Sequence, residues 1–303
     1  MKWLEVSLTT SGENAEAVAD MLAEYAPGGT AISGELDRPG AGATVQAFLA
    51  AEDATPEVQQ KIREGIWHLS QIVPLPEPSF RWIEGEDWAE TWRDHFHPIA
   101  AGRRLLIVPA WMQPNDPLRR PLFLDPGMAF GTGAHLSTRQ CIEALEERIR
   151  PGDLVVDVGC GSGILSVAAV LFGAGHVLAC DIDEHAITAT VRGAELNGVA
   201  SQIEVFQGSL PEVEARLAGF RQADVLVANI LASILRRMLL EEGLADLVGP
   251  AGWIVLSGFL QEQRDELEAA AQQAGLTLEA EAGDGIWVTL TYRKPSESPA
   301  PDR

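Results

Sequence analysis

The sequence lacks several features that would restrict the protein to a few classes. It has no run of about 18 apolar residues, the length that a membrane-spanning helix needs, and its first residues lack the apolar core of a signal peptide. Its three cysteines, Cys141, Cys160 and Cys180, show no Cys-x-x-Cys spacing. The absence of this spacing, and the odd number of cysteines, argue against a zinc site or a disulfide framework. We therefore expect a cytoplasmic protein that does not enter a membrane and has no bound metal.

Basic residues are also scarce. The chain has 22 Lys and Arg against 44 Asp and Glu, a formal net charge of −22. The notable basic clusters are two arginine pairs at 103–104 and 119–120. A field of this sign repels a phosphate backbone and attracts cationic partners, although solubility alone also explains an acidic surface. We expect no direct nucleic-acid binding.

The 303 residues, 46% of them hydrophobic, are enough for two domains. Residues 1–73 predict a small α+β domain with a ferredoxin-like β-α-β-β-α-β order. The sequence pattern indicates strands at 3–8, 31–33 and 44–49 and helices at 13–25 and 56–69. Three prolines between 74 and 78 open a predicted linker, 74–95.

Residues 96–294 predict a larger α/β domain, and the proline-rich residues 295–303 predict a disordered tail. Helical stretches separate most of the apolar runs, which is typical of a parallel sheet with helices on both faces. The last two runs are separated by only a few residues around two glycines, so we expect a terminal hairpin with one antiparallel strand. The seven runs are 154–158, 176–180, 203–206, 223–228, 252–257, 276–280 and 286–291.

The first of these runs ends in a Gly-x-Gly-x-Gly turn, at Gly159, Gly161 and Gly163, and a helix-like segment follows at once. A strand, a tight glycine turn and a helix N-terminus let the backbone approach a nucleotide closely. The pattern is weak evidence by itself. A dinucleotide site has its third glycine one residue later, where this chain has Ile164, and Asp157 would disfavour a nearby phosphate. The turn therefore favours S-adenosylmethionine over a nicotinamide cofactor.

Polar side chains end two of the later predicted strands. Asp181 follows the second strand, about twenty residues past the glycines, where a carboxylate can accept both ribose hydroxyls. Asp183 is better placed to cap the next helix, although both residues could serve only as caps. Asn229 ends the fourth strand, where it can orient a substrate amine, cap the following helix, or do both.

A loop at 125–135 contains three glycines, a proline and one aromatic residue, and leads into a helix that carries Thr138. We expect this loop to fold over the ligand with Phe130, Gly131 and Gly133 in contact with it. His135 is more simply a structural residue than a catalytic base.

Residues 124–135, 156–163, 181–183 and 227–231 together resemble the class I methyltransferases that modify protein eleven of the large ribosomal subunit. The loop sequence Asp-Pro-Gly-x-Ala-Phe-Gly-Thr-Gly-x-His followed later by Asn-Ile-Leu is far more specific than the glycine turn. The resemblance covers essentially the whole chain. It implies a seven-stranded, Rossmann-like class I methyltransferase sheet, an N-terminal substrate-recognition domain and S-adenosylmethionine as cofactor.

The resemblance also implies an activity and a set of site residues. Methyl groups would pass to lysine side chains and the N-terminal amine of the ribosomal protein, and the enzyme would act as a monomer. Cofactor contacts would fall on Thr138, Gly159, Asp181 and Asn229. Three alternatives stay open: a methyltransferase of another protein or a small-molecule amine, a nicotinamide oxidoreductase, and a non-catalytic binding module.

Overall fold

The computed structural model describes residues 2–23, 25–26, 30–34, 42–51, 53–70, 75–84, 97–125, 135–218, 221–283 and 286–296. These residues divide into two compact units, one extending to His97 and the other beginning at Pro98. In the described part of the chain, every helix is too short or too polar to cross a membrane.

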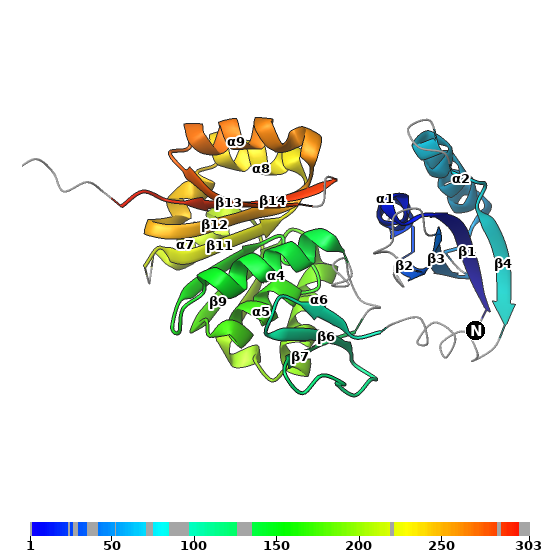
Figure 1. The fold of residues 1–303 in the computed structure, drawn as a ribbon, viewed down its shortest axis with the longest axis horizontal. Helices are drawn as coiled ribbons and strands as arrows, with labels where there is room; N and C mark the ends of the chain where they lie inside the picture. Colours follow the sequence, from blue (N-terminus) through cyan, green and yellow to red (C-terminus); the bar gives the residue numbers. More distant parts are fainter. Residues whose placement is uncertain are drawn as a thin grey trace, which may run out of the picture. The chain divides into compact units, whose positions relative to one another are not determined.

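The N-terminal unit is a four-stranded antiparallel sheet packed against two helices, and its strand order is β2-β3-β1-β4 (Figure 1). Alternate residues of β1 face the helices, so Leu4, Val6 and Leu8 share one core with residues of both helices. The elements are β1 (Lys2–Ser11), α1 (Gly12–Ala23), β2 (Thr30–Gly34), β3 (Gly42–Ala50), α2 (Pro56–Ser70) and β4 (Ser79–Glu84). This is the predicted β-α-β-β-α-β order.

The position of β4 corrects the predicted linker. Residues 79–84 pair with β1 along six residues and form one edge of the N-terminal sheet. The prolines before this strand led to a linker prediction, but they lie outside it and do not interrupt its hydrogen bonds. The remainder of the predicted linker at 74 and 85–95 lies outside the described residues.

The second unit is built on a seven-stranded sheet of order β10-β9-β8-β11-β12-β14-β13. All pairs are parallel except those of β14, which runs antiparallel to both neighbours and forms the predicted terminal hairpin with β13. The strands are β8 (Leu154–Val158), β9 (His176–Asp181), β10 (Ile203–Gln207), β11 (Ala223–Asn229), β12 (Val248–Leu260), β13 (Thr277–Gly283) and β14 (Trp287–Arg293).

Helices cover both faces of this sheet (Figure 1). Neighbouring strand residues face opposite cores: Val155 packs with α4, α5 and α6, whereas Val156 packs with α7, α8 and α9. Such continuous apolar strands are typical of a sheet buried on both faces. The helices are α4 (Leu136–Arg148), α5 (Ile164–Phe172), α6 (Glu184–Leu196), α7 (Leu210–Leu217), α8 (Ala232–Leu240) and α9 (Arg264–Gln273).

A small three-stranded sheet before α4 was not predicted. Its strands are β5 (Ile99–Ala101), β6 (Leu105–Pro109) and β7 (Arg120–Leu124). These strands are short, and their core residues join the cluster that includes α4 and α5. The predicted tail is described only to Ser296, so most of it lies outside the described residues.

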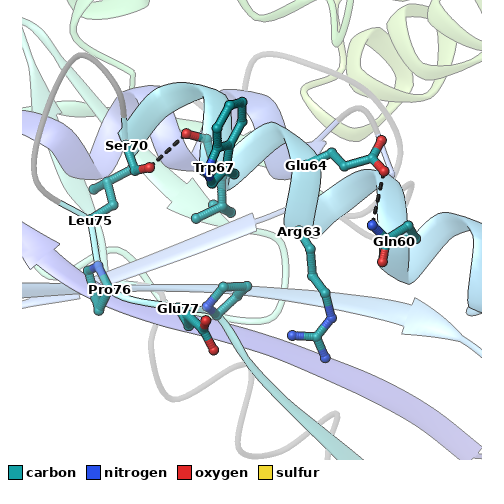
Figure 2. Close-up of a pocket in the computed structure, with 10 residues that line it drawn as sticks. Gln60, Arg63, Glu64, Trp67, Ser70, Leu75, Pro76 and Glu77 are labelled. Carbon is teal, nitrogen blue, oxygen red and sulfur yellow. Dashed lines mark hydrogen bonds between the residues drawn. The ribbon is translucent and has the colours of Figure 1, made fainter.

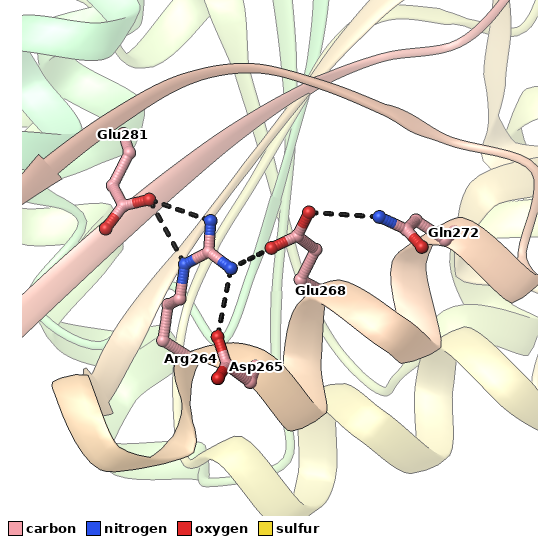
Figure 3. Close-up of polar contacts among 5 residues, drawn as sticks. All are labelled: Arg264, Asp265, Glu268, Gln272 and Glu281. Carbon is pink, nitrogen blue, oxygen red and sulfur yellow. Dashed lines mark hydrogen bonds and ion pairs between the residues drawn. The ribbon is translucent and has the colours of Figure 1, made fainter.

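An arginine connects α9 to the edge strand β13. Arg264 donates from Nε and Nη2 to Glu281 Oε2 at 3.1 and 3.0 Å, and from Nη1 to Asp265 Oδ1 at 3.0 Å and to Glu268 (Figure 3). Three carboxylates therefore share one guanidinium. The contacts join the first turn of the helix to a strand that has only one neighbour in the sheet.

Candidate functional site

The glycine turn after β8 requires glycine at each of its three positions. Gly159, Gly161 and Gly163 have φ values of 76°, 53° and 77°, in the left-handed region. Space is limited as well, because a Cβ on Gly159 would lie 2.4 Å from Ile230 Cγ2 and one on Gly163 would lie 2.8 Å from Thr190 Cα. The turn therefore packs closely against Ile230 and Thr190 and has no room for side chains at Gly159 and Gly163.

Hydrogen bonds fix this turn to neighbouring elements. The amides of Gly159 and Cys160 donate to Cys180 O at the end of β9, at 2.8 and 3.0 Å. Thr190 Oγ1, on α6, donates to Gly161 O at 3.0 Å. The turn is therefore rigidly placed before any ligand arrives.

Asp181 lies beside the glycine turn. Its Oδ2 accepts a hydrogen bond from Gly161 N at 3.0 Å, and its Oδ1 accepts one from Asp183 N at 3.0 Å. Asp183 itself caps α6 by accepting from His185 N at 2.9 Å, which confirms the predicted cap. Two predicted site residues, Gly161 and Asp181, are therefore in direct contact.

Asp157 precedes the same glycine turn, although the sequence pattern did not assign it to the site. It is fully buried, and its Oδ2 accepts from Ser166 Oγ at 2.6 Å. Burial, together with the nearby negative charge of Asp181, raises its pKa to about 7 against the opposing effect of the Ser166 hydrogen bond. Its Oδ1 accepts no hydrogen bond from the residues that the structure describes. The signal in the sequence was a carboxylate two residues before the first glycine of the turn.

Thr138 and Asn229 lie next to each other although 91 residues separate them. Asn229 Nδ2 is 3.5 Å from Thr138 Oγ1, a long hydrogen bond, and Thr138 is buried. The residue at the N-cap of α8 is Leu231, which makes no side-chain cap. Capping of α8 is therefore not a role of Asn229, and its amide points towards α4 instead.

A buried polar chain holds α4 against the sheet next to these two residues. Ser257 Oγ on β12 is 2.6 Å from Thr289 Oγ1 on β14, and Thr289 Oγ1 donates to Gln140 Oε1 at 2.9 Å. Because Gln140 is two residues from Thr138 on α4, these hydrogen bonds help to set the position of Thr138. These positioning residues were missed, since an isolated polar residue in an apolar strand does not show its partner.

His135 has the structural role expected from the sequence. It is the N-cap of α4, its Nδ1 accepts from Ser137 N at 3.2 Å, and its ring packs edge-on against Trp287 with centroids 4.5 Å apart. Phe130, Gly131 and Gly133 lie outside the described residues.

Other chemistries find little support in the described part of the chain. No group of three or more His, Cys, Asp or Glu residues there is arranged to hold a metal ion. All three cysteines are free and buried, and burial raises the pKa of each thiol, so none is a ready nucleophile.

The arrangement suits a cationic ligand better than a pyrophosphate. Two carboxylates, Asp157 and Asp181, lie close enough for one to raise the pKa of the other. In the glycine turn, the amides of Gly159 and Cys160 donate to Cys180 O and that of Gly161 donates to Asp181, so these three amides are not free to bind a phosphate. The site therefore favours a ligand with a positive charge and hydroxyl donors.

Comparison with known proteins identifies the family of this chain. The family model described as "Ribosomal protein L11 methyltransferase (PrmA)" matches residues 2–295. The chain belongs to the ribosomal protein L11 methyltransferase family. The match spans both units, as the resemblance implied. Membership identifies the chain as a methyltransferase and removes the nicotinamide oxidoreductase alternative.

Individual members of the L11 methyltransferase family align over nearly the whole chain. The protein of this name from Pelotomaculum thermopropionicum is 37% identical over 316 residues, 97% of this chain and 99% of that protein. The one from Herpetosiphon aurantiacus is 34% identical over 325 residues, 97% of this chain and 100% of that protein. The crystal structure of the ribosomal protein L11 methylase from Lactobacillus delbrueckii subsp. bulgaricus matches with a TM-score of 0.59 and 33% identity, covering 66% of this chain and 100% of that chain.

Proposed function

We propose that this chain transfers methyl groups from S-adenosylmethionine to lysine side-chain and N-terminal amines of ribosomal protein L11. The family match across residues 2–295 carries the proposal, because it includes the N-terminal unit as well as the methyltransferase sheet. The N-terminal unit would recognise the substrate protein, and its sequence through residue 75 holds 4 basic and 11 acidic residues.

S-Adenosylmethionine would lie at the carboxyl edge of the sheet, over the glycine turn. Asp181 would accept hydrogen bonds from the ribose hydroxyls, and Gly159 and Gly161 would allow close approach of the ligand to the backbone. Thr138, Phe130, Gly131 and Gly133 would complete the site. The cofactor supplies the methyl group on a positively charged sulfur.

Asp157 would pair with the α-ammonium group of the cofactor, directly or through a water. Its Oδ1 is buried and accepts no hydrogen bond from the described residues, so a cation there would satisfy it. A positive charge also favours the ionised carboxylate, which burial disfavours. This role goes beyond the residues chosen from the sequence.

The amine must lose a proton before it attacks. With a lysine pKa of about 10.4, the neutral amine costs about 4 kcal/mol near neutral pH. A partly dry pocket and the adjacent sulfonium both lower that cost. We propose that Asn229 orients the amine and that no dedicated base acts, so the rate comes from positioning.

The residues after Asn229 agree with an alkyl amine as substrate. Ile230, Leu231 and Ala232 contain no aromatic ring that would stack on a planar amide or base. Ile230 packs against Gly159, and Leu231 is 65% exposed at the start of α8. An apolar surface of this kind accommodates the flexible stem of a lysine.

Labelled S-adenosylmethionine tests the function directly. Incubated with this chain, purified L11 should gain label, and the Asp181→Ala variant should label it more slowly at limiting cofactor. An unlabelled L11 with intact cofactor binding would point to another amine substrate. A chain that binds L11 but does not bind the cofactor would be a non-catalytic binding module.

A further inference from the structure

The N-terminal unit contains a pocket of about 310 Å³ that the proposed chemistry does not use. It lies between the outer face of α2 and the segment 75–78 that precedes β4 (Figure 2). Ligand pockets in proteins range upward from about 300 Å³, so this one has room for a side chain or two and not for a large cofactor.

The walls of this pocket, called here the α2 pocket, are largely apolar. Trp67 is 58% exposed on one side, and Pro76 and Pro78 lie on the other. Ile66, buried on the same helix, also lines it. Trp67 and the prolines therefore give the pocket apolar walls that can cover the alkyl stem of a side chain.

Two carboxylates are at the rim of the α2 pocket. Glu64 accepts a hydrogen bond from Gln60 Nε2 at 2.9 Å, and Glu77 lies on the opposite segment (Figure 2). Among the described residues, neither glutamate forms an ion pair. Arg63 also lines the pocket, but its guanidinium lies over the Phe80 ring, 4.2 Å from the centroid.

We propose that the α2 pocket receives a lysine or arginine side chain of the methylated protein and so anchors it to the N-terminal unit. The alkyl stem would cover Trp67 and the prolines, while the cation would meet the indole face and the carboxylates of Glu64 and Glu77. An apolar side chain would take these carboxylates out of water without a partner, and an acidic one would be repelled. The proposal rests on the proposed function for the identity of the protein substrate.

The chain offers a matched control for the tryptophan. Trp82 on β4 belongs to the same unit and is 45% exposed, but it does not line the pocket. The experiment measures kcat and KM for L11 and the cofactor Kd in the full-length chain, its Trp67→Ala and Trp82→Ala variants and the double variant Glu64→Gln/Glu77→Gln.

Trp67→Ala should raise KM for L11 about five- to tenfold, the range expected when a partly desolvated cation–π contact is lost, with kcat and cofactor Kd unchanged. Trp82→Ala should keep the wild-type KM. Glu64→Gln/Glu77→Gln should also raise KM and make it less sensitive to salt, because it removes two charges without removing apolar surface.

Equal KM values for Trp67→Ala, Trp82→Ala and wild type would overturn the proposal. An unchanged KM in the Glu64→Gln/Glu77→Gln variant would overturn it as well. Because these substitutions leave the packing of α2 intact, this variant tests the proposal even if Trp67→Ala unfolds. If the wild type does not methylate L11, the proposed function fails. Titration of L11 into the wild type and the variants then tests the pocket separately, and equal Kd values would reject it.

Discussion

At the scale of single residues, two carboxylates near the glycine turn have different environments and therefore different expected roles. Asp181 is half-buried and accepts hydrogen bonds from two backbone amides. Asp157 is fully buried with one hydroxyl donor, and its pKa is raised to about 7. The first lies at the end of β9 where it can accept hydrogen bonds from ligand hydroxyls, while the second gains most from a cationic ligand.

Replacing Asp181 should weaken cofactor binding selectively. Asp181→Ala should cost roughly 1.5–3 kcal/mol of affinity for S-adenosylmethionine, as expected for lost charge-assisted hydrogen bonds. Asp183→Ala is the control: it removes the α6 cap, lowering the free energy of unfolding by about 1 kcal/mol, but should leave affinity unchanged. Calorimetric titration measures both, and an unchanged Kd for Asp181→Ala would remove that residue from the site.

The raised pKa of Asp157 predicts a pH dependence of stability in the absence of cofactor. Below about pH 4 the carboxyl is protonated in both the folded and the unfolded chain. As pH rises to about 7, the unfolded chain releases a proton that the folded chain retains, so the contribution of Asp157 to the free energy of unfolding falls. The loss is on the order of a few kcal/mol, at about 1.4 kcal/mol per pKa unit.

Asp157→Asn should remove this contribution while keeping an acceptor for Ser166. Denaturant unfolding at several pH values between about 4 and 7 should therefore show a shallower loss of stability in Asp157→Asn than in wild type. Parallel curves for the two proteins would show that Asp157 does not titrate in this range.

At the scale of elements, the glycine turn is determined by two separate requirements, backbone conformation and space. Gly163 and Gly275 have nearly the same φ, 77° and 79°. A Cβ on Gly163 would meet backbone and side-chain atoms of Thr190 within 3.0 Å, whereas one on Gly275 would meet no atom within 4 Å. This pair separates the two requirements experimentally.

Alanine substitution at the two glycines should therefore differ in cost. Gly275→Ala should lower the free energy of unfolding by about 1–2 kcal/mol, the penalty of a left-handed backbone. Gly163→Ala should lower the free energy of unfolding by the same backbone penalty and by roughly 1–3 kcal/mol more, because its Cβ clashes with Thr190 on α6. Denaturant unfolding measures both, and equal costs would show that α6 moves freely away from the turn.

The contacts of Arg264 should stabilise the edge of the sheet more than a single surface ion pair does. Arg264→Ala should lower the free energy of unfolding by about 1 kcal/mol or more, because a partly buried guanidinium serves three carboxylates. Arg236, in a single exposed pair with Glu266 at 2.9 Å, is the control, and Arg236→Ala should cost under about 0.5 kcal/mol. Similar costs would contradict the prediction.

At the scale of the whole molecule, most of the larger sheet could be predicted because each buried strand is a continuous apolar run between turns. The elements that were missed are short or lie next to prolines, as for β4 and for the small sheet of β5, β6 and β7. The helix between the predicted strands 223–228 and 252–257 ends at Leu240, and a 3-10 turn at Leu244–Leu247 follows Gly243, whose φ is 74°. The local hydrophobic pattern alone does not show where a helix is broken in this way.

The candidate site was predictable in its residue types and only partly in its contacts. A glycine turn, a carboxylate after the second strand and an amide after the fourth all follow from chain order and sheet topology. The contact of Asn229 with Thr138 and the single hydroxyl partner of Asp157 depend on how α4 and α5 pack against the sheet. The spacing of residues along the sequence does not determine those packing distances.

Mass spectrometry of L11 after reaction tests the central claim, that this chain methylates amines of L11, most directly. Purified L11 incubated with the chain and S-adenosylmethionine should gain whole methyl increments, and peptide fragmentation should place them on lysine side chains and the N-terminal amine. Asn229→Ala should reduce these increments strongly at saturating cofactor. An L11 of unchanged mass, or methyl groups found only on residues without an amine, would contradict the account.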